Sequence, residues 1–245
     1  MEFYVLASGS NGNCSVIKSK EALVVIDCGM SWEYLFASFC EYDIAIEKAD
    51  ALLVTHLHRD HTRQLDKFDA IKKHVVFDLP GSEKQEFYQE FKVKDLLILP
   101  LAMSHDSPDT TGYLINDGKE SLVYITDTGY LSDYNKHYLH NADYYIMESN
   151  HDPVMLLNTN RPRWLKRRIM YDDGHLSNID CAYHLQELVG EKTKEIVLAH
   201  LSEEANSPQQ ALATLYEVFE NNGVSLQDIK VTVARQYSGL KGGKL

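Results

Sequence analysis

The chain has 245 residues, of which 44% are hydrophobic and 24% are charged, as is typical of a globular protein. Its formal net charge of −12 argues against a nucleic-acid binder that is held by overall positive charge, although bound metal ions or a local basic patch can offset it. We expect no signal peptide and no membrane span, because neither a basic, apolar leader nor an apolar run of about 18 residues occurs. The four cysteines are scattered, without C-x-x-C spacing, which favours a cytoplasmic location.

Short apolar or alternating runs between turn residues predict strands along the whole chain. In the first half they lie at residues 3–6, 15–17, 23–26, 51–54 and 75–77. In the second half they lie at residues 96–99, 112–115, 122–125, 144–147, 196–199 and 229–233. Helices are predicted at residues 33–39, 82–91, 178–189 and 208–221, the last with Ser207 as its N-cap and Pro208 as its first residue. No linker or repeat interrupts this pattern, so we expect a single α/β domain over residues 1–245.

The densest group of potential metal ligands directly follows the strand predicted at residues 51–54. It has the form H-x-H-x-D-H and comprises His56, His58, Asp60 and His61. At a strand end, His56 and His58 point to the same side by the two-residue alternation, and the other two return from the following turn. Imidazole and carboxylate are ligands that zinc, manganese and iron accept. The spacing favours a divalent metal site over a histidine-rich surface loop.

Three more potential ligands follow apolar runs further along the chain, namely His105, Asp127 and His200. Each alone is a weak prediction, because a histidine after a strand is more often a hydrogen-bonded surface residue than a ligand. Together with the first group they make seven candidate ligands. Asp27 also follows a predicted strand, where it is either a support for the site or a plain turn residue.

This set of residues resembles the metallo-β-lactamase superfamily over nearly the whole chain. The resemblance implies an αββα four-layer sandwich that holds its metals on loops at the edge of two packed sheets. It implies one ion at His56, His58 and His105, a second ion at Asp60, His61 and His200, and Asp127 as the bridge between them. Two such ions activate a water as hydroxide, so the implied reaction is hydrolysis, with Asp60 and Asp127 in catalytic roles and zinc, manganese or iron as the metal.

Another histidine, His175, follows Asp172 and Asp173 and is not needed for a seven-ligand site. It lies in the segment Gly-His-Leu-Ser-Asn at the start of a predicted helix. In the nuclease branch of the superfamily, which includes the tRNA 3′-processing enzymes, a similar element supplies a histidine that protonates the leaving oxygen. We therefore expect His175 to act as general acid, unless it only caps the helix.

Several further segments resemble the YycJ family, also called VicX or WalJ. They are residues 8–13, 147–152 and 199–204 and the pair of residues 105 and 106. This resemblance implies a cytoplasmic, metal-dependent exonuclease that acts on DNA in the 5′-to-3′ direction. The expected substrate contacts are Asn150 and His151 in these segments and Ser177 in the segment that contains His175. Ala205 and Arg59 depart from the family pattern, and Ala205 puts details of substrate contact in doubt.

The only dense basic run of the chain lies at residues 161–168, just before His175. Arg163, Lys166 and Arg167 are expected to hold phosphates of a nucleic acid, and Trp164 can stack on a base. The alternative is an amphipathic helix that buries Trp164, Leu165 and Ile169 and leaves its cations in solvent. The two interpretations can both hold.

The sequence thus predicts a metal-dependent hydrolase of phosphodiester bonds, with DNA as the expected partner. One alternative is a thioester or lactone hydrolase of the same fold, which leaves His175 and the basic run unexplained. A second alternative is a non-catalytic regulatory protein that binds metal. The sequence leaves the preference for DNA over RNA and the oligomeric state open.

Overall fold

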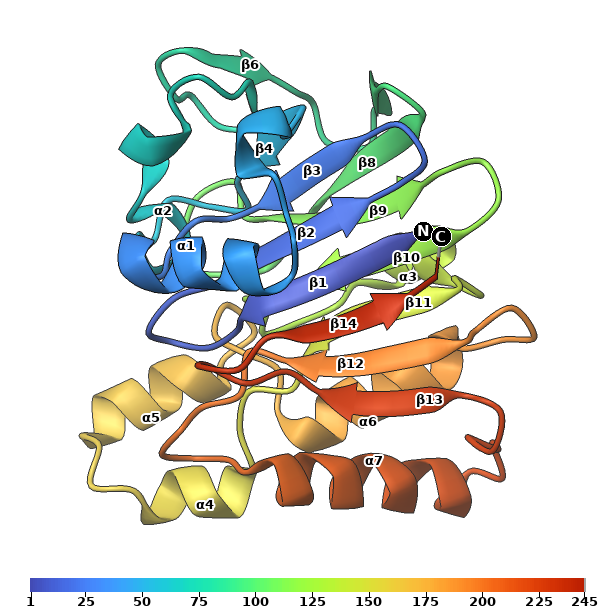
Figure 1. Ribbon diagram of the computed structural model, residues 1–245. Coiled ribbons are helices and arrows are strands. Elements are labelled where there is room, and N and C mark those ends of the chain that lie inside the picture. The colour runs from blue at the N-terminus through green and yellow to red at the C-terminus, as the bar shows by residue number, and fades with distance from the viewer. Residues whose placement is uncertain (245) are drawn as a thin grey trace.

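The computed structural model describes residues 1–244, which fold into two mixed β-sheets with helices outside them (Figure 1). The first sheet contains β1 (Glu2–Ala7), β2 (Cys14–Lys18), β3 (Leu23–Ile26), β4 (Ala51–Leu53), β5 (Lys73–Val75), β6 (Ser82–Lys84) and β14 (Leu240–Gly243). The second sheet contains β7 (Phe91–Val93), β8 (Leu96–Ala102), β9 (Thr111–Asn116), β10 (Ser121–Ile125), β11 (Tyr144–Glu148), β12 (Glu195–Ala199) and β13 (Lys230–Val233). The helices are α1 (Trp32–Glu41), α2 (Arg59–Thr62), α3 (Asp133–Leu139), α4 (Pro153–Asn158), α5 (Arg163–Met170), α6 (Asn178–Leu188) and α7 (Pro208–Asn221), with 3₁₀ turns at Ile46–Lys48 and Leu65–Phe68.

The strand order is β14-β1-β2-β3-β4-β5-β6 in one sheet and β13-β12-β11-β10-β9-β8-β7 in the other. In both sheets an antiparallel part joins a parallel part. The parallel pairs run from β3 to β6 in the first sheet and from β10 to β13 in the second. Because neighbouring parallel strands end at the same edge of a sheet, the loops that follow them gather there.

Three apolar layers hold the fold together. Residues such as Ile26 and Tyr113 fill the space between the sheets, Phe39 of α1 packs on the outer face of the first sheet, and Leu185 and Leu215 pack α6 and α7 on the outer face of the second. Figure 1 shows α1 across the first sheet and α7 along β13. Each fully buried side chain of this kind contributes about 1.5–3 kcal/mol to folding. The predicted αββα sandwich is confirmed.

The helix predicted at residues 82–91 is wrong. Ser82–Lys84 forms β6 beside β5, and a turn connects it to β7. Tyr88 has a φ of 63°, which a right-handed helix cannot accommodate. Its ring packs against side chains of α3, and its hydroxyl donates to Oδ1 of Asn135 at 3.1 Å. These tertiary contacts override the local helix pattern.

Smaller differences concern the lengths and number of elements. The strand predicted at residues 75–77 forms two residues earlier, as β5. Helices α3 and α4 and the strand β14 were not predicted, because each is short and depends on its packing partners. Helix α7 begins as expected, with Ser207 accepting a hydrogen bond from the backbone N–H of Gln210. None of the helices in residues 1–244 is both long and apolar enough to cross a bilayer.

Candidate metal centre and hydrolytic site

All seven predicted ligands lie at one edge of the two sheets, on the loops that follow their strands. Four of them follow β4: His56 and His58 lie in the loop after that strand, and Asp60 and His61 lie in α2. The other three follow strands of the second sheet: His105 after β8, Asp127 after β10 and His200 after β12. Strands β10, β11 and β12 are parallel, so their carboxyl ends bring residues distant in the sequence together.

Strained backbone turns direct three acidic or histidine side chains into this edge. Asp27, Asp127 and His200 have φ values of 61°, 55° and 55°, in the left-handed region. Such a conformation costs a residue other than glycine about 1–3 kcal/mol, and it clusters at functional sites. Here each of these residues lies one or two positions after a strand, so the reversal turns its side chain toward the ligand cluster.

The first group of ligand atoms comes from His56, His58 and His105, and these atoms lie within 4.8 Å of one another. Nδ1 of His105 donates to the carbonyl oxygen of Gly174 at 2.9 Å, which leaves its Nε2 available to a metal ion. Within residues 1–244, the buried Nε2 of His56 has no hydrogen-bond partner. Burial and the neighbouring His61 lower the pKa of His56, so it is a neutral imidazole that can bind a metal.

The second group comes from Asp60, His61 and His200, again within 4.8 Å. Nδ1 of His61 donates to Oδ2 of Asp27 at 2.7 Å, and the backbone N–H of Thr55 donates to Oδ1 of Asp27 at 2.8 Å. The fully buried Asp27 therefore supports a ligand and is more than a turn residue. The Nε2 of His61 faces inward, 3.6 Å from Oδ2 of Asp60.

Asp127 lies between the two groups. Its Oδ2 is 3.1 Å from Nε2 of His61, and its Oδ1 is 3.8 Å from Nε2 of His105. Burial would raise the pKa of Asp127, but the adjacent His200 and His61 lower it well below its usual value. Among the described residues, Oδ2 of Asp127 and Nε2 of His200 have no hydrogen-bond partner. Unpartnered buried imidazole and carboxylate atoms that face one another fit the donor set of divalent metal ions.

Glu148, the last residue of β11, connects this cluster to His175. Its Oε1 accepts hydrogen bonds from Nδ1 of His175 at 2.8 Å and Nδ1 of His200 at 2.7 Å. Its Oε2 accepts from the backbone N–H groups of Thr128 and Leu176. Burial would raise the pKa of Glu148, but the two histidines lower it to about 2, so it is ionised.

Sequence reasoning did not assign Glu148 to the site. Glu148 lies in the segment at residues 147–152, but the only acids that the sequence analysis named beside His175 were Asp172 and Asp173, its neighbours in the chain. The acidic partner comes instead from a strand 27 residues earlier. The available signal was that Glu148 is the last residue of an apolar strand, while the predicted ligands lie shortly after the ends of other apolar strands.

The three substrate contacts predicted near these strands are largely engaged within the protein. The side-chain amide of Asn150 donates to the carbonyl oxygen of His200 at 2.9 Å, which fixes the position of that ligand. The hydroxyl of Ser177 accepts from the backbone N–H of Asp180 and caps α6. His151 is 2% exposed and lines a cavity of about 400 Å³ that His175 also lines.

The cations of the basic run, which lie in α5 and just before it, line two different cavities. The predicted phosphate contacts line a small cavity, which comprises Leu157, Arg163, Lys166, Arg167 and Met170. Arg161 and Arg168 instead line a cavity of about 400 Å³ beside His105 and His175. Of the three side chains that the amphipathic-helix alternative buries, Ile169 is buried and Leu165 is partly buried, whereas Trp164 is 67% exposed, so that alternative is wrong for Trp164.

Comparison with known proteins agrees with this geometry. A model of the Beta-lactamase superfamily domain matches residues 23–201, which include all seven predicted ligands. The chain is 33% identical to the exodeoxyribonuclease YycJ of Bacillus anthracis over an alignment of 240 residues, covering 91% of this chain and 90% of that protein. It is 32% identical to the exodeoxyribonuclease WalJ of Streptococcus pneumoniae serotype 2 over 233 residues, covering 87% of this chain and 86% of that protein.

A solved structure shares the fold at lower identity. The metallo-beta-lactamase fold protein YhfI of Bacillus subtilis superposes with a TM-score of 0.74 and 17% identity, covering 98% of this chain and 99% of that chain. The family model, the two relatives and the fold agree on one family. The chain therefore belongs to the metallo-β-lactamase superfamily and is a hydrolase of its YycJ and WalJ group.

Proposed function

We propose that this chain is a metal-dependent nuclease that removes nucleotides from DNA in the 5′-to-3′ direction. One observation carries the proposal: a single carboxylate, that of Glu148, hydrogen-bonds both His200 in the ligand cluster and His175 beside it. A proton donor is thereby held at a fixed position next to the predicted metals. The names of the YycJ and WalJ relatives support DNA as the substrate.

The proposed cofactors are two divalent ions, zinc or manganese, with iron as an alternative. The two ligand groups described above would each hold one ion, and Asp127 would lie between them. When bound, such a pair of ions activates water and neutralises charge on a phosphoryl group. The buried, unpartnered Nε2 atoms of His56 and His200 support this assignment.

The part of the chemistry that the chain itself supplies centres on His175. Because its Nδ1–H is held by Glu148, its other ring nitrogen, Nε2, is free to carry the proton for the leaving oxygen. Water oxygen bonds to phosphorus as the bond from phosphorus to the leaving oxygen breaks. His175 gives its proton to the leaving oxygen, and the proton lost by the attacking water passes to solvent, from which His175 is reprotonated. Glu148 holds the ring in position for this transfer through its hydrogen bond with Nδ1.

Substrate contact is proposed on both sides of this centre. Arg163, Lys166 and Arg167, beside the exposed Trp164, would contact flanking DNA by charge and stacking. His151 would line the site of a nucleotide next to His175, and Asn150 and Ser177 would position the loops that form it. We further propose that residues 1–245 act as one domain in the cytoplasm, where the unbridged cysteines would remain reduced.

The test compares substrate classes on protein reconstituted with manganese or zinc. We expect hydrolysis of duplex DNA and of bis(p-nitrophenyl) phosphate, and a loss of about 100-fold in both activities in the Asp127→Asn variant. Turnover of thioester or lactone substrates with intact phosphodiesters would establish the small-molecule alternative instead. Metal binding without turnover of any substrate would favour the regulatory alternative.

A further inference from the structure

We infer that Arg161 and Arg168 form a binding subsite for a phosphate group next to the scissile phosphodiester. In the absence of substrate, the carboxylates of Asp106 and Glu204 form ion pairs with these arginines. The phosphate of a bound substrate displaces both carboxylates. The inference rests on the proposed nuclease function and specifies which part of the substrate this chain recognises.

The location of the two arginines supports this subsite. They line the same cavity of about 400 Å³ as His105, a predicted metal ligand, and His175, the predicted proton donor. Phosphates follow one another along a nucleic-acid strand, so a diester at the metal centre brings a neighbouring phosphate close to this cavity. Leu165 and Ile169 form the apolar wall that supports the arginine side of the cavity.

The contact of Arg168 indicates what it binds. Its Nε and Nη2 both contact Oδ2 of Asp106, so the guanidinium presents two donors to one anionic oxygen. The other oxygen of Asp106 lies 3.3 Å from Nε2 of His105 and 3.8 Å from Nε2 of His58. Asp106 therefore places an anion between the arginine and the predicted ligands, where one oxygen of a bound phosphate would lie.

Arg161 is held in a similar way by a more exposed partner. Its Nε donates to Oε2 of Glu204 at 2.9 Å, and its Nη2 is 3.5 Å from the hydroxyl of Ser202. The side chain of Arg161 is 21% exposed and that of Glu204 is 63% exposed. An ion pair with a solvated carboxylate contributes little, whereas a planar guanidinium binds phosphate through two charge-assisted hydrogen bonds. Replacement of Glu204 by a phosphate is therefore favourable.

The phosphate that these arginines bind can be either a terminal 5′-phosphate or the adjoining diester within the strand. Both present anionic oxygens to the same arginines. Substrates that differ only at these positions distinguish them: a duplex with a 5′-hydroxyl, and a duplex with an uncharged methylphosphonate at the adjoining linkage.

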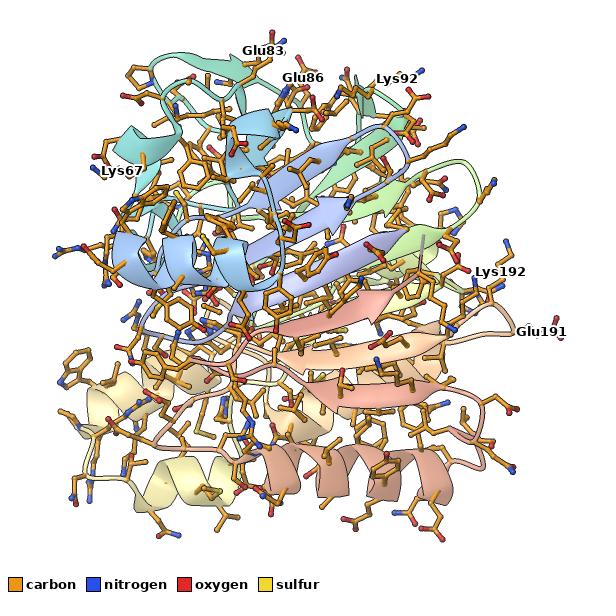
Figure 2. The ribbon with its side chains drawn as sticks, viewed as in Figure 1. Lys67, Glu83, Glu86, Lys92, Glu191 and Lys192 are labelled. Carbon is orange, nitrogen blue, oxygen red and sulfur yellow. The ribbon has the colours of Figure 1, made fainter. Side chains whose placement is uncertain are left out.

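The experiment measures KM for a 5′-phosphorylated duplex with the Arg161→Ala and Arg168→Ala variants. We expect an increase in KM of about tenfold for each variant. Hydrolysis of bis(p-nitrophenyl) phosphate, which has no second phosphate, should change by a smaller factor than hydrolysis of the duplex. Lys192→Ala is the matched control, because this lysine lies on the opposite side of the molecule from α5 (Figure 2) and should leave both substrates unaffected.

Removal of a competing carboxylate should have the opposite effect. We expect Glu204→Gln to lower KM for the duplex two- to fivefold, and the matched Glu191→Gln variant, on the same distant loop as Lys192, to leave it unchanged (Figure 2). The arginine variants should lose their effect on whichever substrate lacks the recognised phosphate, the 5′-hydroxyl duplex or the methylphosphonate duplex.

Failure of this inference is separable from failure of the nuclease proposal. Duplex binding is also measured by fluorescence anisotropy in an Asp127→Asn background, where turnover does not interfere. If wild-type protein cleaves DNA but the arginine variants change neither KM nor binding, or change the small diester equally, the subsite is refuted. If wild-type protein hydrolyses no phosphodiester, the nuclease proposal fails, while weaker duplex binding by the arginine variants still supports the subsite.

Discussion

At the scale of single residues, the site is defined by which nitrogen of each histidine is already engaged. Nδ1 of His61 donates to Asp27, Nδ1 of His105 to a backbone carbonyl, and Nδ1 of His200 to Glu148. Each bond fixes the ring orientation and leaves Nε2 directed into the cluster. The sequence predicts the histidines from their spacing, but their partners come from distant strands and become visible only in the fold.

Glu148→Gln tests this arrangement because it removes the negative charge and keeps the size of the side chain. We expect metal affinity to fall about 10- to 100-fold, because His200 loses the acceptor that orients it. The kcat for DNA should also fall, because His175 loses the acceptor that holds its Nδ1–H in position. Metal titration and steady-state kinetics measure the two effects.

Glu195→Gln is the matched control for that variant. Glu195 is also buried, at 4% exposure, but it lies at the start of β12, whereas His200 follows the end of that strand. Glu195→Gln should alter stability without altering metal affinity or kcat. Equal metal affinity in wild type and Glu148→Gln would show that Glu148 does not position the ligand.

At the scale of elements, apolar runs predicted most strands and the residues that follow them. Prediction failed where packing decides the structure. The segment at residues 82–91 has a helix-like pattern, yet the contact of Tyr88 with α3 imposes a positive φ. The basic run at residues 161–168 was singled out from its composition, but which of its cations line the cavity beside His175 depends on how α5 packs, with Ile169 buried and Trp164 exposed.

The close contact of two loops at Gly29 provides a test at this scale. A Cβ atom at Gly29 would lie 1.5 Å from the carbonyl oxygen of Asp60, which is backbone and cannot move aside. The neighbouring Cys28 donates its N–H to the carbonyl oxygen of His61 at 2.8 Å, so the two loops are held together. We expect Gly29→Ala to lower the free energy of unfolding by about 1–3 kcal/mol and to weaken metal binding.

Thermal unfolding and metal titration check this expectation. Gly112→Ala is the control, because the three atoms nearest to its Cβ would be side-chain atoms of Met103 and Ile125, at 3.0 Å or more. Gly112→Ala should lower the free energy of unfolding by less than Gly29→Ala does, and it should leave metal binding intact. Normal metal affinity in Gly29→Ala would contradict the role given to this contact.

At the scale of the whole molecule, the resemblance to a superfamily predicted the αββα layers, but not the contacts that join the sheets. Glu120, just before β10, accepts hydrogen bonds from the amino group of Met1 at 2.5 Å, from Lys194 at 2.8 Å and from the hydroxyl of Tyr144 at 2.9 Å. It thereby connects the start of β1 to three strands of the second sheet. No local pattern marks a contact between residues 119 positions apart.

This cluster should make stability depend on pH at acidic values. Burial would raise the pKa of Glu120, but Lys194, the Met1 amine and Tyr144 lower it from 4.5 to about 2. A lowered folded-state pKa stabilises the fold fully above pH 4.5, and this contribution is lost as the pH falls from 4.5 toward 2. We expect Glu120→Gln to lower the free energy of unfolding by about 1–2 kcal/mol at pH 7, after discounting for solvent screening.

The difference in free energy of unfolding between wild type and Glu120→Gln should decrease as the pH falls from 4.5 toward 2. Chemical denaturation at several pH values measures it. A difference that stays constant between pH 7 and pH 3 would contradict the assigned contribution of the charge.

The most direct test of the proposed chemistry uses duplex DNA labelled at either the 5′ or the 3′ end. Protein is reconstituted separately with manganese and with zinc, beside the Asp127→Asn variant. We predict immediate release of labelled mononucleotide from the 5′-labelled duplex, progressive shortening of the 3′-labelled strand, and neither product with the variant. DNA and a matched RNA set that stay intact with both metals, or equal degradation by wild type and variant, would contradict a nuclease that works through this site.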